Sequence, residues 1–173
     1  MELKFDHIIH YINQLNQFEF PGKLLKLHNG GKHHQFGTYN QLSYINGNYI
    51  ELLDVEDKEK LKKVAKTEEG RVSFATKIAQ DDFNQGFKTI CLRTKDIEEV
   101  KATLQKKNID VIGPIRMERE NKKGDKVGWQ LLYIADPSYN VKPPFFIQWD
   151  ESEAYKNESL KDLYPVSYTH LTL

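Results

Sequence analysis

The chain has 173 residues, with 25 basic and 25 acidic side chains and no formal net charge, so it has no global electrostatic attraction to nucleic acid or to anionic membranes. It fits one domain or two small repeats, can bury about 70% of the surface that it exposes when unfolded, and contains no run of about 20 apolar residues that would span a bilayer. Cys91 is the single cysteine and the N-terminus lacks a signal-peptide pattern, so we expect a reduced, cytoplasmic protein with neither nucleic-acid nor membrane partners.

The first strand is predicted over Leu3 to Ile12, an apolar and β-branched run that contains two histidines. The two-residue period of a strand divides its side chains between two faces, with His7, Ile9 and Tyr11 on one and Asp6, Ile8 and His10 on the other. A histidine in such a strand either packs with a hydrogen bond or lines a pocket, and both readings stay open. The next strand is expected to start at Leu24, Leu25 and Leu27, after a turn at Pro21-Gly22.

Gly30 to Asp54 is predicted to form two strands joined by a tight turn at Asn46-Gly47, a dipeptide that tolerates positive φ. Glu51 lies in the second of these strands among apolar neighbours. A carboxylate there is costly to bury without a cation, a metal or hydrogen-bond donors beside it. Upstream polar residues could serve as those partners and make the sheet a ligand site: His33, His34, Thr38 and Asn40.

A helical connector is predicted over residues 56–85. Leu61, Val64 and Ala65 recur at helical spacing in a charged segment, which indicates a solvated amphipathic helix. A second helix is expected over Val72 to Ile78, with Phe74, Ala75 and Ile78 directed inward.

The second half of the chain repeats the order of the first. A strand over Phe87 to Arg93 is followed by a helix from Asp96 to Lys107, with Asp96 as N-cap and a buried stripe of Ile97, Val100 and Leu104. The remaining predicted elements are the strand Val111 to Glu120, the turn Asn121 to Asp125, and the strands Gly128 to Ile134 and Phe145 to Trp149. The first half matches this order with its helix shortened, so we predict two duplicated modules over residues 3–55 and 86–150.

The duplicated βαβββ order occurs together with FDHII in the first strand, YIELL in the fourth and PPFFIQWD in the eighth. With the segment GGKHHQFGTYNQLSYINGNYIELL, this chain resembles the glyoxalase-like domain of the vicinal oxygen chelate superfamily, which includes glyoxalase I, extradiol dioxygenases and bleomycin-resistance proteins. The resemblance covers Phe5 to Asp150. It implies an α+β fold in which two βαβββ modules form a curved mixed sheet with a concave ligand cleft.

The resemblance also implies a divalent metal held by the first, fourth, fifth and eighth strands. His7 matches the first-strand ligand and Glu51 the fourth-strand one, whereas the other two positions fall on Thr89 and Gln148, which are poor ligands. His33 could complete a His/His/Glu set for Zn, Fe, Mn or Ni. The alternative is a set of pocket-lining hydrogen-bonding residues with no cofactor.

Other side chains are candidates for contact with a substrate. Thr38, Asn40 and Gln148 are expected to hydrogen-bond to it. Arg93 either clamps a carboxylate or phosphate or faces solvent, and Trp129 either floors the pocket or fills the core. Cys91 should share a face with Arg93, where a buried and inert thiol is the simplest interpretation.

These observations favour an enzyme of lyase, isomerase or dioxygenase type that acts on a small oxygenated compound in a cleft. Glu51 would be the base or a metal ligand, and His7 a ligand or proton shuttle. The alternative is a non-catalytic, resistance-type protein that binds or sequesters a small molecule. In both cases the partner is a small-molecule ligand, and a homodimer stays open.

We expect one glyoxalase-like domain over residues 1–150. Residues 151–173 are expected to be a C-terminal tail that is truncated or partly non-native, because the sequence after Tyr164-Pro165 stops without a natural end.

Overall fold

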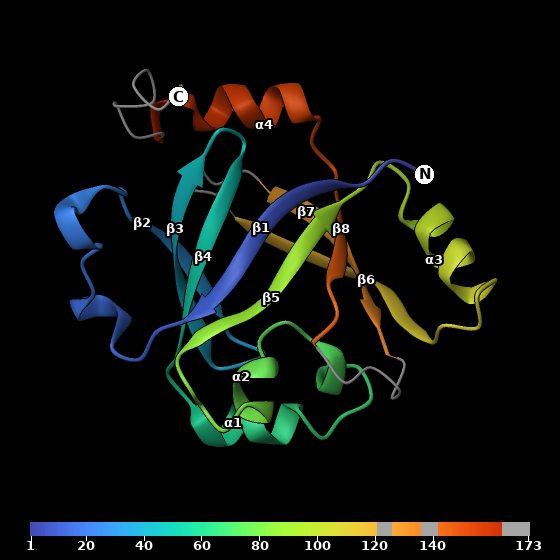
Figure 1. The fold of residues 1–173 in the computed structure, drawn as a ribbon, viewed down its shortest axis with the longest axis horizontal. Helices are drawn as coiled ribbons and strands as arrows, with labels where there is room; N and C mark the ends of the chain where they lie inside the picture. The colour runs from blue at the N-terminus through green and yellow to red at the C-terminus, as the bar shows by residue number, and fades with distance from the viewer. Residues whose placement is uncertain (121–125, 136–141, 164–173) are drawn as a thin grey trace.

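A computed structural model describes residues 1–120, 126–135 and 142–163, and these residues form one eight-stranded sheet with the order β2-β3-β4-β1-β5-β8-β7-β6 (Figure 1). The strands are β1 (Lys4–Tyr11), β2 (His28–His33), β3 (Thr38–Ile45), β4 (Asn48–Val55), β5 (Gly86–Arg93), β6 (Val111–Glu120), β7 (Lys126–Ile134) and β8 (Phe145–Trp149). The predicted turn at Asn121 to Asp125 and the end of the tail, residues 164–173, lie outside the described residues.

The sheet consists of two modules with the same connectivity. In each, the first strand pairs in parallel with the last (β1 with β4, β5 with β8), and the last three strands form an antiparallel meander. The modules meet where β1 pairs antiparallel with β5. The predicted duplication and the predicted glyoxalase-type fold are therefore confirmed.

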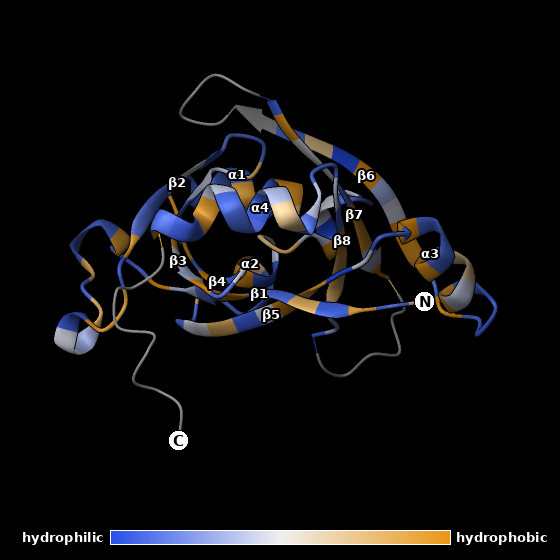
Figure 2. Ribbon diagram, turned by 90° about the horizontal axis from the view of Figure 1, so that it is seen from above, coloured by the Kyte–Doolittle hydropathy of each residue, from blue (hydrophilic) through white to orange (hydrophobic). Residues whose placement is uncertain are grey.

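Helices and short helical turns cover the outer face and the two ends of the curved sheet. They are α1 (Lys58–Val64), α2 (Lys77–Gln80), α3 (Ile97–Gln105) and α4 (Glu153–Leu160), with the 3-10 turns η1 (Leu15–Gln17), η2 (Pro21–Lys23), η3 (Gly70–Val72) and η4 (Lys161–Leu163). Figures 1 and 2 show α4 at one end of the sheet's concave side and α1 with α2 at the opposite end.

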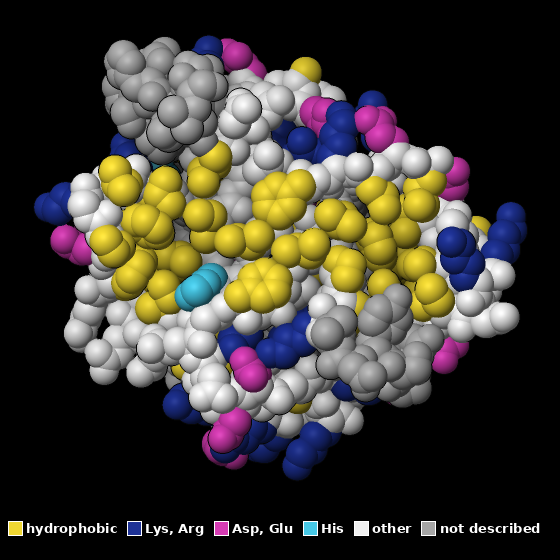
Figure 3. Space-filling view, in the orientation of Figure 1, with side chains coloured by type: hydrophobic (Ala, Val, Ile, Leu, Met, Phe, Trp, Pro, Cys, Tyr) yellow, Lys and Arg dark blue, Asp and Glu magenta, His cyan; other side chains and the backbone are white. Residues whose placement is uncertain are grey.

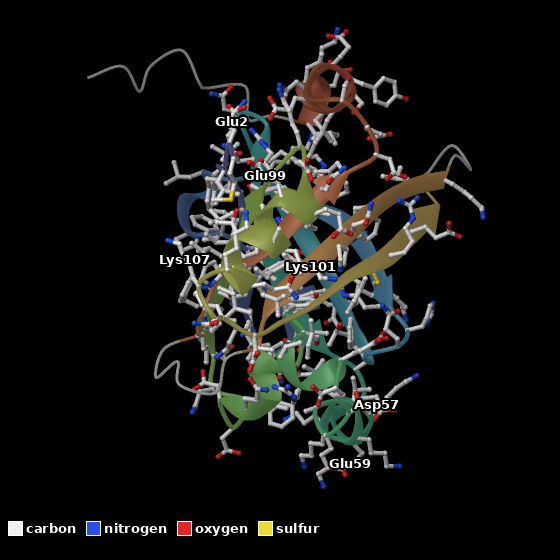
Figure 4. The ribbon with its side chains drawn as sticks, turned by 90° about the vertical axis from the view of Figure 1, so that its right-hand side faces the viewer. Glu2, Asp57, Glu59, Glu99, Lys101 and Lys107 are labelled. Atoms are coloured by element: carbon white, nitrogen blue, oxygen red, sulfur yellow. The ribbon has the colours of Figure 1, made fainter. Side chains whose placement is uncertain are left out.

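The helix α3 lies on the convex side against β6, β7 and β8, as Figure 4 shows from that side, with Glu99 at its upper end. The Asp96 side chain accepts a hydrogen bond from the Glu99 backbone N–H at 2.9 Å, which confirms the predicted N-cap. Ile97 and Val100 are buried against Leu132, Ile134 and Phe146, with Leu104 partly buried beside them. In the first module the corresponding connection holds only the turns η1 and η2, which agrees with the prediction that its helix is shortened.

Two predicted elements are wrong. Val72 to Ile78 is not a continuous helix, because Ser73 is extended between η3 and α2. This break lets the Phe74 ring stack on Phe145, with 6.0 Å between ring centroids, and Phe74, Ala75 and Ile78 are buried as expected. Leu24 to Leu27 do not start a strand, because η2 with Gly22 at a φ of 69° turns the chain and leaves Leu24 72% exposed.

An apolar band crosses the convex face at the junction of the modules, where neither α3 nor the turns of the first module cover the sheet (Figure 3). On the two strands that meet at this junction, β1 and β5, Phe5 and Phe87 are 42% and 55% exposed, and Ile8 pairs in register with Ile50 on one side and Ile90 on the other.

Within the described ranges, no helix is both long enough and apolar enough to cross a membrane.

Candidate active site

A β-bulge in β1 directs two consecutive side chains into the concave side of the sheet. Phe5 pairs with Leu92 and His7 pairs with Cys91, so Asp6 is an extra residue on β1 with no counterpart on β5. Asp6 and His7 are consequently both buried, at 0% and 3% exposed. The regular alternation that assigned Asp6 to the opposite face from His7 is wrong at this point.

Asp6 is the centre of a buried polar cluster. Its Oδ1 accepts a hydrogen bond from Nδ1 of His7 at 2.7 Å, and its Oδ2 accepts from Nε1 of Trp149 at 3.1 Å and from Nζ of Lys156 at 3.2 Å. The guanidinium of Arg93 lies 3.6 Å from the same Oδ2. Burial by itself raises the pKa of Asp6, but the hydrogen bond and charge of His7 and the neighbouring Lys156 together hold that pKa well below its ordinary value.

The other ring nitrogen of His7 faces Glu51. Nε2 lies 3.6 Å from Oε2 of Glu51, and both side chains are almost closed to solvent, at 4% and 7% exposed. Asn40 fixes the carboxylate: its Nδ2 donates to Oε1 of Glu51 at 2.7 Å, while its Oδ1 accepts from the Gly31 N–H at 2.8 Å. The His7 ring also stacks on Tyr49 at 4.3 Å between centroids. His7 is thus held between two carboxylates, each of which contacts one of its nitrogens.

The duplication identifies which positions of the second module correspond to His7 and Glu51. The pairs between β1 and β5 are symmetric about Ile8 and Ile90, because His7 pairs with Cys91 and Ile9 pairs with Thr89. Thr89 is therefore the counterpart of His7 in the second module. Glu51 pairs with the residue two beyond His7 in β1, and Phe145 pairs with the residue two beyond Thr89 in β5, so Phe145 is the counterpart of Glu51. The predicted eighth-strand position, Gln148, lies three residues beyond Phe145.

The side chains of Gln148 and Thr89 each make a hydrogen bond to the backbone of another segment. Oε1 of Gln148 accepts from the backbone N–H of Ile97 at 2.8 Å, so this side chain lies on the α3 side of β8 and away from the cluster. Oγ1 of Thr89 donates to the carbonyl of Pro143 at 3.0 Å.

The remaining predicted residues lie at different distances from the cluster. His33 shares a hydrogen bond of 3.0 Å with Oγ1 of Thr38 and packs edge-on against Phe74. Trp129 contacts Trp149 at 5.3 Å between centroids, and so touches the cluster through that ring. Arg93, besides its approach to Asp6, donates to the carbonyl of Gly47 and to Asn48 at 3.2 Å each.

The side chains that could hold a divalent metal differ from the predicted His7, Glu51 and His33. Among the described residues, one group of three places its potential ligand atoms within 4.8 Å of one another: Asp6, His7 and Cys91. Glu51 adjoins this group through His7, whereas His33 is outside it. Phe145, the counterpart of Glu51, offers no ligand, burial raises the pKa of the Cys91 thiol, and Lys156 already places a positive charge against Asp6. With Lys156 in this position the donors do not fit a resident divalent ion.

A hollow of about 490 Å³ lies outside this cluster, lined by His10, Ile12, Asn13, Gln14, Gln17, Phe18 and Gln85. The concave side at His7 is instead filled by side chains, including that of Lys156, which is 9% exposed. The described arrangement is a closed one.

Three cluster residues were not among the predicted site residues: Asp6, Trp149 and Lys156. Asp6 adjoins His7 in the motif FDHII, and two consecutive polar residues in an apolar strand could have signalled a bulge. Lys156 lies in the segment that was expected to be a tail. Nothing in its local sequence marks it as buried.

The comparisons with known proteins agree with this fold. The glyoxalase-like domain family matches residues 5–169. A search among proteins with curated descriptions finds no match. A hypothetical protein from Staphylococcus aureus is 59% identical, with a TM-score of 0.90. The match covers 94% of this chain and 65% of that protein, so the chain spans less than two thirds of the length of this relative.

Two more distant structures share the fold. A hypothetical protein from Bacillus halodurans has a TM-score of 0.56 at 19% identity, and the match covers 88% of this chain and 96% of that one. A methylmalonyl-CoA epimerase from Streptomyces coelicolor has a TM-score of 0.52 at 15% identity, with 85% and 97% covered. The family match over nearly the whole chain and the duplicated modules lead to one conclusion: the chain belongs to the glyoxalase-like domain family.

Proposed function

We propose that this protein is an enzyme of isomerase or lyase type, which moves a proton on a small oxygenated compound bound at the concave face. The observation that carries the proposal is the position of His7 between Asp6 at 2.7 Å and Glu51 at 3.6 Å. Proton transfer needs a base and an acid whose positions are fixed, and these side chains are held from both sides.

The roles follow from the hydrogen bonds. An ionised Asp6 can only accept, so His7 must carry a proton on Nδ1, and its Nε2 is left to exchange a proton on the side of Glu51. Asn40 holds Glu51 through Oε1 and leaves Oε2 directed at His7. His7 would therefore act as proton shuttle and Glu51 as base.

The ligand would meet these groups against aromatic surface. Tyr49 and Phe145 pack on the His7 ring, at 4.3 and 5.6 Å between centroids. An apolar wall beside a few fixed polar groups is typical of small-molecule sites. Because both carboxylates are shielded from water, each interaction with a developing charge is stronger than it would be at the surface.

Epimerisation belongs to this class of chemistry, and the methylmalonyl-CoA epimerase from Streptomyces coelicolor has the same fold. That likeness concerns fold alone. The proposed chemistry comes from the geometry around His7, and the substrate of the epimerase is not carried over.

The second candidate is a binding or sequestering protein of the resistance type. The closed packing around His7 favours it, because a ligand trapped behind Lys156 would be released slowly. Such a protein would bind its ligand tightly without transferring a proton to or from it.

The test is hydrogen exchange in D₂O, followed by proton NMR with pyruvate, lactate and glyceraldehyde as probes, because removal of a C–H proton is visible even without net turnover. We expect exchange with the wild-type protein, and a loss of at least about 100-fold in Glu51→Gln and in His7→Gln. His10→Gln is the matched control, since His10 lies on the same strand but faces the convex side; it should exchange like the wild type.

Equal exchange in wild type and Glu51→Gln would refute the proton-transfer role. Binding of a probe without exchange, unchanged in Glu51→Gln, would instead support the sequestering protein.

A further inference from the structure

Lys156 reaches the polar cluster from outside the two modules. It lies on α4, which Ser152 caps by accepting from the backbone N–H of Tyr155, and which Glu153 attaches to Lys4. From there the side chain extends to the concave side of the sheet, where Nζ lies 3.2 Å from Oδ2 of Asp6.

The surroundings of the Lys156 ammonium group stabilise a positive charge. Nζ lies 4.3 Å from the ring centroid of Trp149 and 5.4 Å from that of Tyr49, so two aromatic faces and one carboxylate surround it. Trp149 donates its own N–H to the same Oδ2 of Asp6, which keeps the indole in place. Carboxylate and rings together form a built site for positive charge.

The charges of the cluster require such a group. Two carboxylates, Asp6 and Glu51, are buried close to His7, and Arg93 approaches only one of them, at 3.6 Å. Buried negative charge without a partner is strongly unfavourable. The superfamily resemblance implies a divalent metal for this region, yet the second module offers Thr89 and the apolar Phe145 where two further ligands would stand.

We propose that the ammonium group of Lys156 supplies the positive charge that a divalent cation would otherwise supply, so that Lys156 and a metal compete for the same carboxylate cluster. The group within 4.8 Å that a metal could use, Asp6, His7 and Cys91, includes the carboxylate that Lys156 neutralises. Removing the ammonium group vacates that carboxylate and opens the position to a metal.

This inference deepens the proposed function, because it concerns the same cluster, but its test measures metal binding and not proton exchange. Cobalt(II) is the probe, since a cobalt–thiolate bond gives a charge-transfer absorption that reports Cys91 directly. The titration compares the wild type with Lys156→Ala, Lys156→Gln and Lys156→Arg, and Lys161→Ala is the matched control, because Lys161 is exposed and pairs only locally with Glu158 among the described contacts.

We expect Lys156→Ala and Lys156→Gln to bind cobalt at least tenfold more tightly than the wild type, with the charge-transfer band. Lys156→Arg, which keeps the charge, and Lys161→Ala should behave like the wild type. In Lys156→Ala combined with Cys91→Ser the band should disappear. Lys156→Gln retains a hydrogen-bond donor for Asp6, so it serves as the neutral variant if Lys156→Ala does not fold.

The inference would be overturned if Lys156→Ala and Lys156→Gln bound cobalt no more tightly than the wild type does. Equal gains in Lys156→Arg would show that size and not charge matters, and would also overturn it. Proton exchange in wild type without added metal is measured separately, so the proposed function can fail while competition at the cluster holds, and the reverse.

Discussion

Replacement of Asp6 by Asn tests whether the buried cluster depends on one carboxylate. The change keeps the shape of the side chain, but it removes the charge beside Lys156 and turns one acceptor oxygen into a donor. Nδ1 of His7, Nε1 of Trp149 and Nζ of Lys156 all point at this carboxylate, so at least one donor is left without its acceptor.

The magnitude follows from burial. Asp6 is 0% exposed, and breaking a buried ion pair by removing one partner typically costs about 3–5 kcal/mol, because the other charge stays buried and unpaired. Domains of this kind are stable by about 5–15 kcal/mol in total. We therefore expect Asp6→Asn to remove a large fraction of the free energy of unfolding.

Urea unfolding followed by tryptophan fluorescence measures this loss, since Trp149 itself contacts Asp6. Asp150→Asn is the control: Asp150 pairs with Arg116 at the surface, where an ion pair contributes about 0–1 kcal/mol. In the double variant Asp6→Asn with Lys156→Gln, the loss should be smaller than the sum of the two single losses by about 1 kcal/mol or more. A loss below 1 kcal/mol in Asp6→Asn, or additive losses in the double variant, would refute the reasoning.

Three further predictions concern the core, the pH dependence and the thiol. Val100→Asp should unfold the protein, because it buries an unpaired carboxylate between α3 and the sheet, where Val100 is 1% exposed; an unchanged melting temperature would contradict the packing of α3. The folded state lowers the pKa of Asp6 below its ordinary 3.8, so the stabilising contribution of Asp6 is fully present above that pH and declines as the pH falls towards the folded pKa. The free energy of unfolding of Asp6→Asn should therefore fall less steeply with decreasing pH below about pH 4 than that of the wild type. Cys91 is 0% exposed and burial raises the pKa of its thiol, so a disulfide reagent should modify it only after unfolding in urea; rapid reaction with the native protein would show that the cluster opens readily.

The architecture followed from the sequence where local patterns and packing agree. Alternation placed β4 with Glu51 on the concave side, the N-cap at Asp96 marked the start of α3, and the repeated order of elements revealed the duplication. Each of these depends on residues close together in the chain.

The site could be predicted only in part, because it depends on contacts between distant residues. His7 and Glu51 were paired through the resemblance, and they do lie together. The bulge at Asp6 is visible only from its pairing with β5, and Lys156 enters the cluster 150 residues further along the chain. Gln148 was taken as the eighth-strand position in place of Phe145, because an error of a few residues in register moves a side chain to the other face of the sheet.

The repeated modules leave the concave side unequal across its axis. Where the first module presents imidazole and carboxylate, at His7 and Glu51, the second presents a hydroxyl that already donates to the carbonyl of Pro143 and a phenyl ring, at Thr89 and Phe145. A compound lying across the axis would find partners for its oxygen atoms on one side only and would turn its carbon skeleton to the other. Two modules of the same fold can in this way bind a ligand in a single orientation. Two identical modules would bind it equally well in either orientation.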